Sequence, residues 1–268
     1  MSEPGFIVTK EYRRFAEFCD ACRRERYIGL CYGPPGVGKT LSARHYAAWD
    51  TVAPALEAIL TTMELPTLAP TIIASRSVLY TPTVTNTPRR IAEDLDSLFR
   101  RFDALVETAL HPEADGFLTI RHWQTALLVV DEADRLKMPG LEQLRDTYDR
   151  HNLGLVLIGM PGLEKRLARF AQLYSRVGFV HQFRALSVEE MRFILTYKWQ
   201  EMGRTLAPDD FTDTEAVAAM IRITGGNFRL VQRLCSQIAR IVEINALRTV
   251  TAEVVEAARE SLVIGPLL

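Results

Sequence analysis

Long apolar runs are missing from this chain of 268 residues. None of its apolar stretches approaches the ~20 residues that a membrane-spanning helix needs. Residues 1–8 also lack the charged start and apolar stretch of a secretory signal. We therefore expect a cytoplasmic protein with no membrane partner.

An excess of charge and a set of metal-ligating cysteines are missing too. The 32 Lys and Arg residues and the 33 Asp and Glu residues leave a net charge of -1, so any contact with a polyanion has to be local. Of the four cysteines, only Cys19 and Cys22 have a C-x-x-C spacing. A structural zinc site needs four ligands, and no second pair or nearby histidine supplies them. Reduced thiols are the favoured interpretation, with a metal site as the alternative.

The pattern of apolar residues predicts an α/β fold. Hydrophobic residues make up 48% of the chain, which is enough to bury a core. Short apolar runs, typical of buried parallel strands, alternate with amphipathic segments, so we expect a parallel sheet sandwiched by helices. The expected strands are residues 27–32, 77–81, 126–130 and 153–158. The expected helices are residues 9–24, a segment after Thr40, residues 141–151, and 88–110, where Thr87 is the N-cap.

Two regions depart from this alternation. Residues 51–74 keep a helical pattern, but Pro54, Pro66 and Pro70 should break any long helix, so we interpret the region as an insertion. From residue 186 onward the pattern is helical, with helices expected at about 188–203, 213–223, 228–245 and 252–262. Ser187 and Glu190 form a capping box at the start of the first. The sequence thus predicts an α/β domain over residues 1–185 and a small all-helical domain over residues 186–268.

A glycine-rich run follows the first expected strand and has the Walker A spacing G-x-x-x-x-G-K-T. It consists of Gly33, Pro34, Pro35, Gly36, Val37, Gly38, Lys39 and Thr40, and Leu41 follows in the next helix. In such a loop, backbone N–H groups surround phosphate oxygens and the helix N-terminus adds its positive end. Lys39 then reaches the β- and γ-phosphates, and the Thr40 hydroxyl binds Mg²⁺. The run predicts an ATP site; the alternative is a glycine-rich turn that binds nothing.

Two carboxylates, Asp131 and Glu132, follow the apolar run Leu-Leu-Val-Val at residues 127–130. Ligands of open α/β sheets bind at the carboxyl ends of the strands, where these residues are expected. Asp131 would hold the Mg²⁺ shell, and Glu132 would orient and deprotonate the attacking water. The alternative is an acidic start to an ordinary loop. Together the two motifs predict ATP hydrolysis.

The motifs taken together resemble those of AAA+ ATPases: the phosphate loop, the run Asp-Glu-Ala-Asp-Arg-Leu at residues 131–136, and Gly-Gly-Asn-Phe-Arg at residues 225–229 before a helical end. The resemblance implies a P-loop core followed by a helical lid domain. Within that superfamily, the chain most resembles the transposition ATPases of the MuB, TnsC and TniB type in its small size, in the Asp-Glu-Ala-Asp-Arg-Leu run and in the strand at residues 155–159. ExeA-like secretion ATPases and origin-recognition or clamp-loader ATPases share the same skeleton.

The resemblance assigns roles to two arginines. It implies that Arg229 is the sensor 2 arginine, which approaches the γ-phosphate; the alternative is that Arg229 is a solvated helix residue. Arg176 is placed like an arginine finger that reaches a neighbouring subunit's site, with Arg166 and Arg169 as competitors. Such a head-to-tail interface closes into a ring or continues as a helical filament, so a homo-oligomer is implied.

One position departs from the family pattern. Met160 follows the fourth expected strand, where the family has a polar sensor 1 side chain. Methionine cannot position a water by hydrogen bonding as a polar side chain does. We therefore expect slow hydrolysis, in which ATP binding drives assembly and hydrolysis drives release.

Members of the transposition group bind duplex DNA through the segment after the second strand. The matching stretch is residues 81–90, in which Thr85, Asn86, Arg89 and Arg90 suit phosphate contacts that carry no sequence information. Lys137 is a second candidate, and an ordinary solvated loop is the alternative. The resemblance implies a regulator that assembles on target DNA and recruits or activates a transposase. The alternatives are a replication-type loader that acts on DNA and an ExeA-like ATPase that acts on proteins.

Overall fold

The computed structural model describes residues 5–57, 65–111, 124–207 and 210–262. These residues form two compact units, which are described separately. The α/β unit comprises residues 12–33 and 39–183. The helical unit comprises residues 1–11, 34–38 and 184–268.

The α/β unit is built on a parallel sheet of five strands in the order β2-β3-β4-β1-β5. The sequence predicted four of the five as continuous apolar runs, and these are confirmed because each is almost wholly buried. The strands are β1 (Ile28–Tyr32), β2 (Ser77–Tyr80), β3 (Leu127–Val130), β4 (Gly154–Gly159) and β5 (Val177–Gln182).

The fifth strand was missed by the sequence analysis. β5 lies at an edge of the sheet and its residues alternate between half-buried and exposed positions, with Val180 58% exposed. An edge strand of this kind needs no continuous apolar run, and a glycine, a histidine and a glutamine interrupt the apolar pattern. The first predicted domain therefore contains one strand more than expected.

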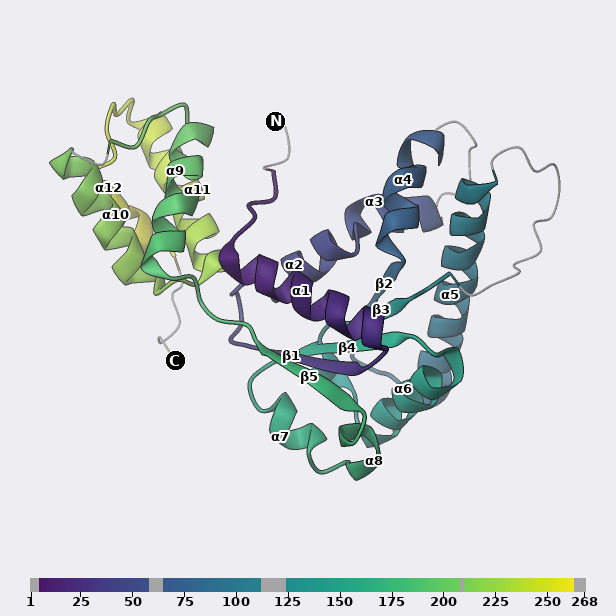
Figure 1. The fold of residues 1–268 in the computed structure, drawn as a ribbon. Helices are drawn as coiled ribbons and strands as arrows, with labels where there is room; N and C mark the ends of the chain where they lie inside the picture. Colours follow the sequence, from purple (N-terminus) through teal and green to yellow (C-terminus); the bar gives the residue numbers. More distant parts are fainter. Residues whose placement is uncertain (1–4, 58–64, 112–123, 208–209, 263–268) are drawn as a thin grey trace. The chain divides into compact units, whose positions relative to one another are not determined.

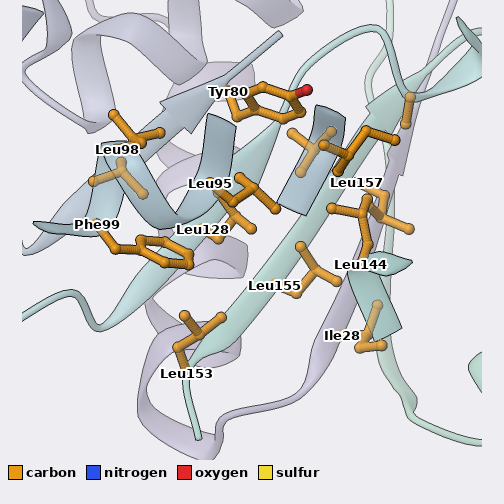
Figure 2. Close-up of a cluster of buried hydrophobic side chains, with 14 of the residues drawn as sticks. Ile28, Tyr80, Leu95, Leu98, Phe99, Leu128, Leu144, Leu153, Leu155 and Leu157 are labelled. Atoms are coloured by element: carbon orange, nitrogen blue, oxygen red, sulfur yellow. The ribbon is translucent and has the colours of Figure 1, made fainter. Parts of the chain in front are cut away.

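Helices cover both faces of the sheet, as the alternation of apolar runs predicted. On one face lies α1 (Lys10–Glu25), whose Phe18 and Cys22 side chains leave no space for a side chain at Gly29 of β1. On the other lie α5 (Pro88–Leu110) and α6 (Met138–His151) (Figure 1). Their apolar side chains form one buried cluster with those of the strands (Figure 2), including Ile28, Leu95, Leu98, Phe99, Leu128, Leu144, Leu155 and Leu157. The predicted N-cap of α5 is confirmed, because the Thr87 side chain accepts a hydrogen bond from the Arg90 N–H.

The helical pattern of residues 51–74 corresponds to two short helices in the described residues, and two of the prolines lie inside them. Pro54 lies inside α3 (Trp49–Glu57) and Pro70 inside α4 (Leu65–Ser75). A proline inside a helix removes one backbone hydrogen bond. Burial offsets this cost, because Val52 of α3 and Ile72 of α4 belong to the main core. Residues 58–64 lie outside the described part of the chain.

Short helices complete the α/β unit. They are α2 (Lys39–Tyr46), the 3₁₀ helix η1 (Ala133–Arg135), α7 (Leu163–Leu167) and α8 (Ala171–Tyr174). α2 follows the glycine-rich loop directly and η1 follows the two carboxylates after β3. These two helices therefore position the residues of the candidate site.

The helical unit contains the helices expected after residue 186. They are α9 (Val188–Glu201), α10 (Phe211–Thr224), α11 (Phe228–Ile244) and α12 (Ala252–Glu260). The capping box of Ser187 and Glu190 is present, and Trp199 is buried in a core that these helices share. Across the described residues, no helix is both long enough and apolar enough to cross a membrane.

The four thiols should be unreactive in the folded protein. Cys19, Cys22 and Cys31 are fully buried and Cys235 is 5% exposed. Burial raises the pKa of Cys22 and of Cys235 to about 12, from 9.0. Because the thiolate is the reactive form, we expect Ellman's reagent to label no thiol of the native protein at pH 8, and all four after denaturation. Rapid labelling of the native protein would contradict this burial.

The same shifts predict that stability falls at alkaline pH. Cysteines in the unfolded chain ionise near pH 9, whereas Cys22 and Cys235 in the folded chain resist ionisation up to about pH 12. Their contribution to stability is complete below pH 9 and is lost as the pH rises through this window. Chemical denaturation at pH 8 and pH 10.5 measures the effect, and equal unfolding free energies would contradict it.

A buried carboxylate joins α5 to the segment before β3. Asp103 Oδ1 accepts hydrogen bonds from the backbone N–H of Gln124 at 3.1 Å, and from the N–H and hydroxyl of Thr125, both at 3.0 Å. The substitution Asp103→Ala would leave two buried N–H groups without an acceptor. We expect it to lower the free energy of unfolding by about 2–4 kcal/mol, measured by chemical denaturation.

The matched control for Asp103 lies on the exposed side of the same helix. Asp96 forms an i,i+4 ion pair with Arg100, and its side chain is 54% exposed. Asp96→Ala should cost less than about 1 kcal/mol, as is usual for surface ion pairs. Equal effects of the two substitutions would contradict the role given to Asp103.

Candidate nucleotide-binding site

The glycine-rich loop follows β1 and has the backbone of a phosphate loop. Gly36 and Gly38 have φ values of +79° and +110°, which residues other than glycine rarely adopt. At Gly33 a Cβ atom would lie 2.2 Å from the carbonyl oxygen of Phe183, so only glycine fits there. The Gly33 N–H donates to the Gly159 carbonyl at 3.3 Å, which fixes the start of the loop to the end of β4.

The loop leads directly into the N-terminus of α2, at Lys39. The Lys39 ammonium donates to the carbonyl oxygen of Gly33 at 2.6 Å, so the side chain folds back along the loop that it would share with phosphates. The N–H groups at a helix start attract anions. Leu41, in the first turn of α2, is 42% exposed. The predicted loop residues are thus adjacent to a helix N-terminus, as anion binding requires.

A hydrogen bond joins the two sequence motifs. The Thr40 hydroxyl donates to Asp131 Oδ2 at 2.7 Å, across 91 residues of sequence. Asp131 is 4% exposed, and its other oxygen accepts the Glu132 N–H at 2.9 Å. A hydroxyl and a carboxylate oxygen side by side are the kind of ligand that Mg²⁺ prefers. The predicted Mg²⁺ ligands, Thr40 and Asp131, therefore lie side by side, and their oxygen atoms are of the type that binds Mg²⁺.

Glu132 has an unusual backbone and a charged partner. It adopts the left-handed conformation, with φ 54° and ψ 41°, at the start of η1. Its buried Oε2 atom makes no hydrogen bond but forms an ion pair with Nη2 of Arg135. The side chain predicted to act as the base is therefore engaged by a cation from its own helix.

The end of β4 carries no polar side chain where the family has sensor 1. Met160 is 39% exposed, and its backbone N–H donates to Asp134 Oδ2 at 2.9 Å. A Cβ at Gly159 would lie 2.7 Å from the same carboxylate oxygen. The polar group beside Met160 is therefore Asp134, to which the sequence analysis gave no role; the acidic run at residues 131–134 was the only signal.

Two of the three candidate finger arginines, Arg176 and Arg166, have side-chain partners within the chain. Arg176 donates to both carboxylate oxygens of Asp149, at 2.8 and 3.0 Å, and to the carbonyl of Gln172. Arg176 directly precedes β5, so it lies at the end of the sheet where the parallel strands begin. The glycine-rich loop lies at the opposite end, where the strands finish. Arg166 donates to the Asp134 carbonyl at 2.9 Å, and Arg169 is exposed.

Within the helical unit, residues 34–38 contact the start of α11. The Asn227 amide donates to the Pro35 carbonyl at 2.9 Å, and the Arg229 N–H donates to the Gly36 carbonyl at 2.9 Å. Asn227 is also the N-cap of α11, where its side chain accepts a hydrogen bond from the Leu230 N–H at 3.2 Å. The structure thus places Arg229 beside the glycine-rich loop. The contact of Asn227 with Pro35 was not predicted.

The predicted DNA segment forms a compact loop whose arginines are paired. The Asn86 amide donates to the carbonyls of Thr83, at 2.8 Å, and Arg135, at 3.3 Å. The Thr83 hydroxyl donates to the Thr85 carbonyl at 2.9 Å. Both arginines form ion pairs one turn along α5, Arg89 with Glu93 at 2.8 Å and Arg90 with Asp94 at 2.9 Å. Lys137 is exposed at the N-cap of α6.

Known proteins resemble this chain in sequence. A "Potential ATP-binding protein" of Staphylococcus aureus is 47% identical over 274 residues, which cover 97% of each chain. A second relative, the Mu-like prophage FluMu DNA transposition protein B of Haemophilus influenzae (strain ATCC 51907 / DSM 11121 / KW20 / Rd), is 26% identical. That match covers 85% of this chain and 70% of the relative.

Solved structures resemble it in fold. The RuvB Holliday junction branch migration motor of Thermotoga maritima has a TM-score of 0.61 at 17% identity, over 96% of this chain and 70% of that one. The Aeropyrum pernix ORC1 protein in complex with DNA has a TM-score of 0.58 at 20% identity, over 97% of this chain and 67% of that one. At these identities the likeness shows the fold: a P-loop NTPase with a parallel five-stranded sheet, flanking helices and a helical C-terminal region.

A family model described as an AAA domain matches residues 22–167. That match takes in the glycine-rich loop, both carboxylates and four of the five strands, which is more than half of the chain. Together with the close relative from Staphylococcus aureus, it shows that this protein belongs to the AAA domain family.

Proposed function

We propose that the chain is an ATP-dependent, sequence-nonspecific DNA-binding AAA+ ATPase. In this proposal it assembles on target DNA and recruits or activates a transposase. The observation that carries the nucleotide part is the 2.7 Å hydrogen bond between Thr40 and Asp131, because it brings the two nucleotide-binding motifs into one site. The transposition part rests on the 26% identity to a DNA transposition protein B.

The chemistry proposed for the site is transfer of the γ-phosphoryl group to water. The residues from Gly33 to Leu41 surround the phosphates of ATP, and Lys39 neutralises part of their charge. Thr40 and Asp131 hold Mg²⁺, which supplies positive charge to the phosphate oxygens when bound. Once the Glu132 carboxylate is released from its ion pair with Arg135, it accepts the proton of the attacking water.

Slow and assembly-dependent turnover is part of the proposal. Met160 cannot position a water by hydrogen bonding through its side chain. Arg176 lies where the parallel strands begin, whereas the glycine-rich loop of the same chain lies where they end. We propose that Arg176 serves the site of a neighbouring subunit in a ring or filament, and that Arg229 senses the γ-phosphate in its own chain. The boundary between core and lid is proposed at residues 185 and 186.

For the DNA contact we propose the loop and helix start that contain Thr85, Asn86, Arg89 and Arg90. Hydroxyl, amide and guanidinium groups suit phosphates, and they position a protein on DNA without reading its sequence. Because Glu93 and Asp94 offset both arginine charges, each arginine must exchange its carboxylate for a phosphate. This favours modest, salt-sensitive affinity per subunit, with tight binding only for an assembly.

Electron microscopy of negatively stained mixtures tests the proposal. Purified protein would be mixed with duplex DNA and either a non-hydrolysable ATP analogue, ADP or no nucleotide. We expect rings or filaments along the duplex with the analogue only. Dispersed particles in all three mixtures would overturn the DNA-binding part and favour an AAA+ ATPase that acts on a protein partner.

A further inference from the structure

Two large apolar side chains are exposed where the loop between β2 and α5 meets the start of α6. Val84 in the loop is 80% exposed, and Met138 in the first turn of α6 is 51% exposed. Asn86 joins the two segments: its amide donates to the Arg135 carbonyl at 3.3 Å, and a Cβ at Gly140 would lie 3.7 Å from its Oδ1 atom. Val84 and Met138 are each two residues from this contact, and two residues span at most about 7 Å. One turn of duplex DNA, about 34 Å long, can therefore contact both side chains.

Three hydrogen bonds hold the loop backbone on both sides of this valine. The Thr83 hydroxyl donates to the Thr85 carbonyl at 2.9 Å, and the Thr83 carbonyl accepts the Asn86 amide at 2.8 Å. The Arg135 guanidinium donates to the Pro82 carbonyl at 3.0 Å. A valine side chain is itself stiff, because branching at Cβ leaves few rotamers. The apolar tip of the loop is therefore preorganised and loses little conformational entropy when a ligand covers it.

The exposure of this tip is unusual within the protein. Single exposed apolar side chains are common on protein surfaces and need no function. Val84, however, is more exposed than any other large apolar side chain of the described residues, and it lies on a fixed loop. A stiff apolar group held in solvent in this way suits insertion into a ligand.

Cationic side chains surround the apolar tip. Lys137, directly before Met138, is exposed and forms no ion pair within the described part of the chain. Arg89 and Arg90, in the first turn of α5, are exposed as well. Because phosphates line both edges of each DNA groove, cations around an apolar tip favour a DNA groove over an apolar protein surface as its partner.

We propose that Val84 is an apolar wedge that inserts at a base step from the minor groove, with Met138 packed on neighbouring sugars, an inference that rests on the proposed function. Apolar wedges partly unstack a base step and bend the duplex. Unstacking costs less where the step is mispaired or flexible. The preferred ligand is therefore duplex DNA that contains such a step. Since the wedge reads no base edge, fully paired duplexes of mixed sequence should bind alike.

The test compares two duplexes of one sequence, one fully paired and one with a single central mismatch. Each is titrated with the full-length protein and a non-hydrolysable ATP analogue. By fluorescence anisotropy, wild type should bind the mismatched duplex about tenfold more tightly, because part of the cost of unstacking is already met. A 2-aminopurine at the central step of the paired duplex should become brighter on binding, since it loses stacking.

The variants remove the wedge without removing charge. Val84→Ala deletes two methyl groups, and Val84→Thr keeps the shape but adds a hydroxyl; both should reduce the preference to less than about twofold and abolish the 2-aminopurine signal. The slope of log affinity against log salt should stay at its wild-type value. Met138→Ala should give a preference between those of wild type and Val84→Ala. The matched control is Val180→Ala on β5, a valine that is 58% exposed, which should behave as wild type.

Failure of the wedge and failure of the proposed function give different results. Wild type that binds both duplexes equally, or Val84 variants that keep the preference and the 2-aminopurine signal, would overturn the wedge and leave the proposed function intact. Wild type that binds neither duplex in any nucleotide state would overturn both.

Discussion

Replacing Glu132 by glutamine should lower the rate of ATP hydrolysis by about 10²- to 10⁴-fold, the usual contribution of a general base. Glutamine has nearly the same shape but cannot accept a proton from the attacking water. ATP affinity should be unchanged, because Thr40 and Asp131 keep their 2.7 Å hydrogen bond in this variant. Phosphate release and binding of a fluorescent ATP analogue measure the two quantities separately.

The matched control for Glu132→Gln is Glu142→Gln on α6, an exposed residue paired with Arg145 at 2.7 Å. It should leave both quantities at their wild-type values. Turnover by Glu132→Gln within a few-fold of wild type would show that another group activates the water. Asp134, beside Met160, would then be the next residue to substitute.

Replacing Lys39 by alanine should weaken ATP binding by roughly 30- to 1000-fold, which corresponds to about 2–4 kcal/mol for the loss of one partner of a desolvated charge pair. In the structure its ammonium bonds the Gly33 carbonyl at 2.6 Å, so it already lies along the loop where the phosphates would bind. Titration calorimetry with ATP measures the change in affinity.

Lys165→Ala provides the comparison for Lys39→Ala. Lys165 is exposed on α7, and its loss should leave ATP affinity unchanged. If Lys39→Ala bound ATP as tightly as wild type, the glycine-rich loop would not be the nucleotide site. If Lys165→Ala were equally impaired, the effect would be one of overall charge.

The parts of the fold that sequence predicted are those whose burial is complete. β1, β3 and β4 are almost wholly buried, so each reads as an apolar run, and α5 begins at the expected N-cap, Thr87. β5 has one exposed face at a sheet edge, and no continuous run announces it. Residues 51–74 kept a helical pattern in the sequence, but prolines inside the two short helices were not expected; tertiary packing of Val52 and Ile72 offsets the missing backbone bonds.

In the candidate site, too, some features could be predicted from the sequence and others could not. Its loop and carboxylates could be predicted, because phosphate binding constrains residues that are neighbours in sequence. The contacts that connect it to other segments could not. Arg135 to Pro82 spans 53 residues and Asn227 to Pro35 spans 192, and neither pair has a sequence pattern of its own. The pairing of Arg89 and Arg90 with acidic residues could have been foreseen from their i,i+4 spacing.

The central claim is that ATP binding enables this protein to bind duplex DNA through contacts to the sugar-phosphate backbone of the DNA. Fluorescence anisotropy of two labelled duplexes of unrelated sequence, titrated with protein at several salt concentrations, tests it most directly. The account predicts tight binding with a non-hydrolysable ATP analogue, weak binding with ADP, equal affinities for the two duplexes, and a steep loss of affinity as salt rises. Binding that does not depend on nucleotide, or no binding in any nucleotide state, would contradict it.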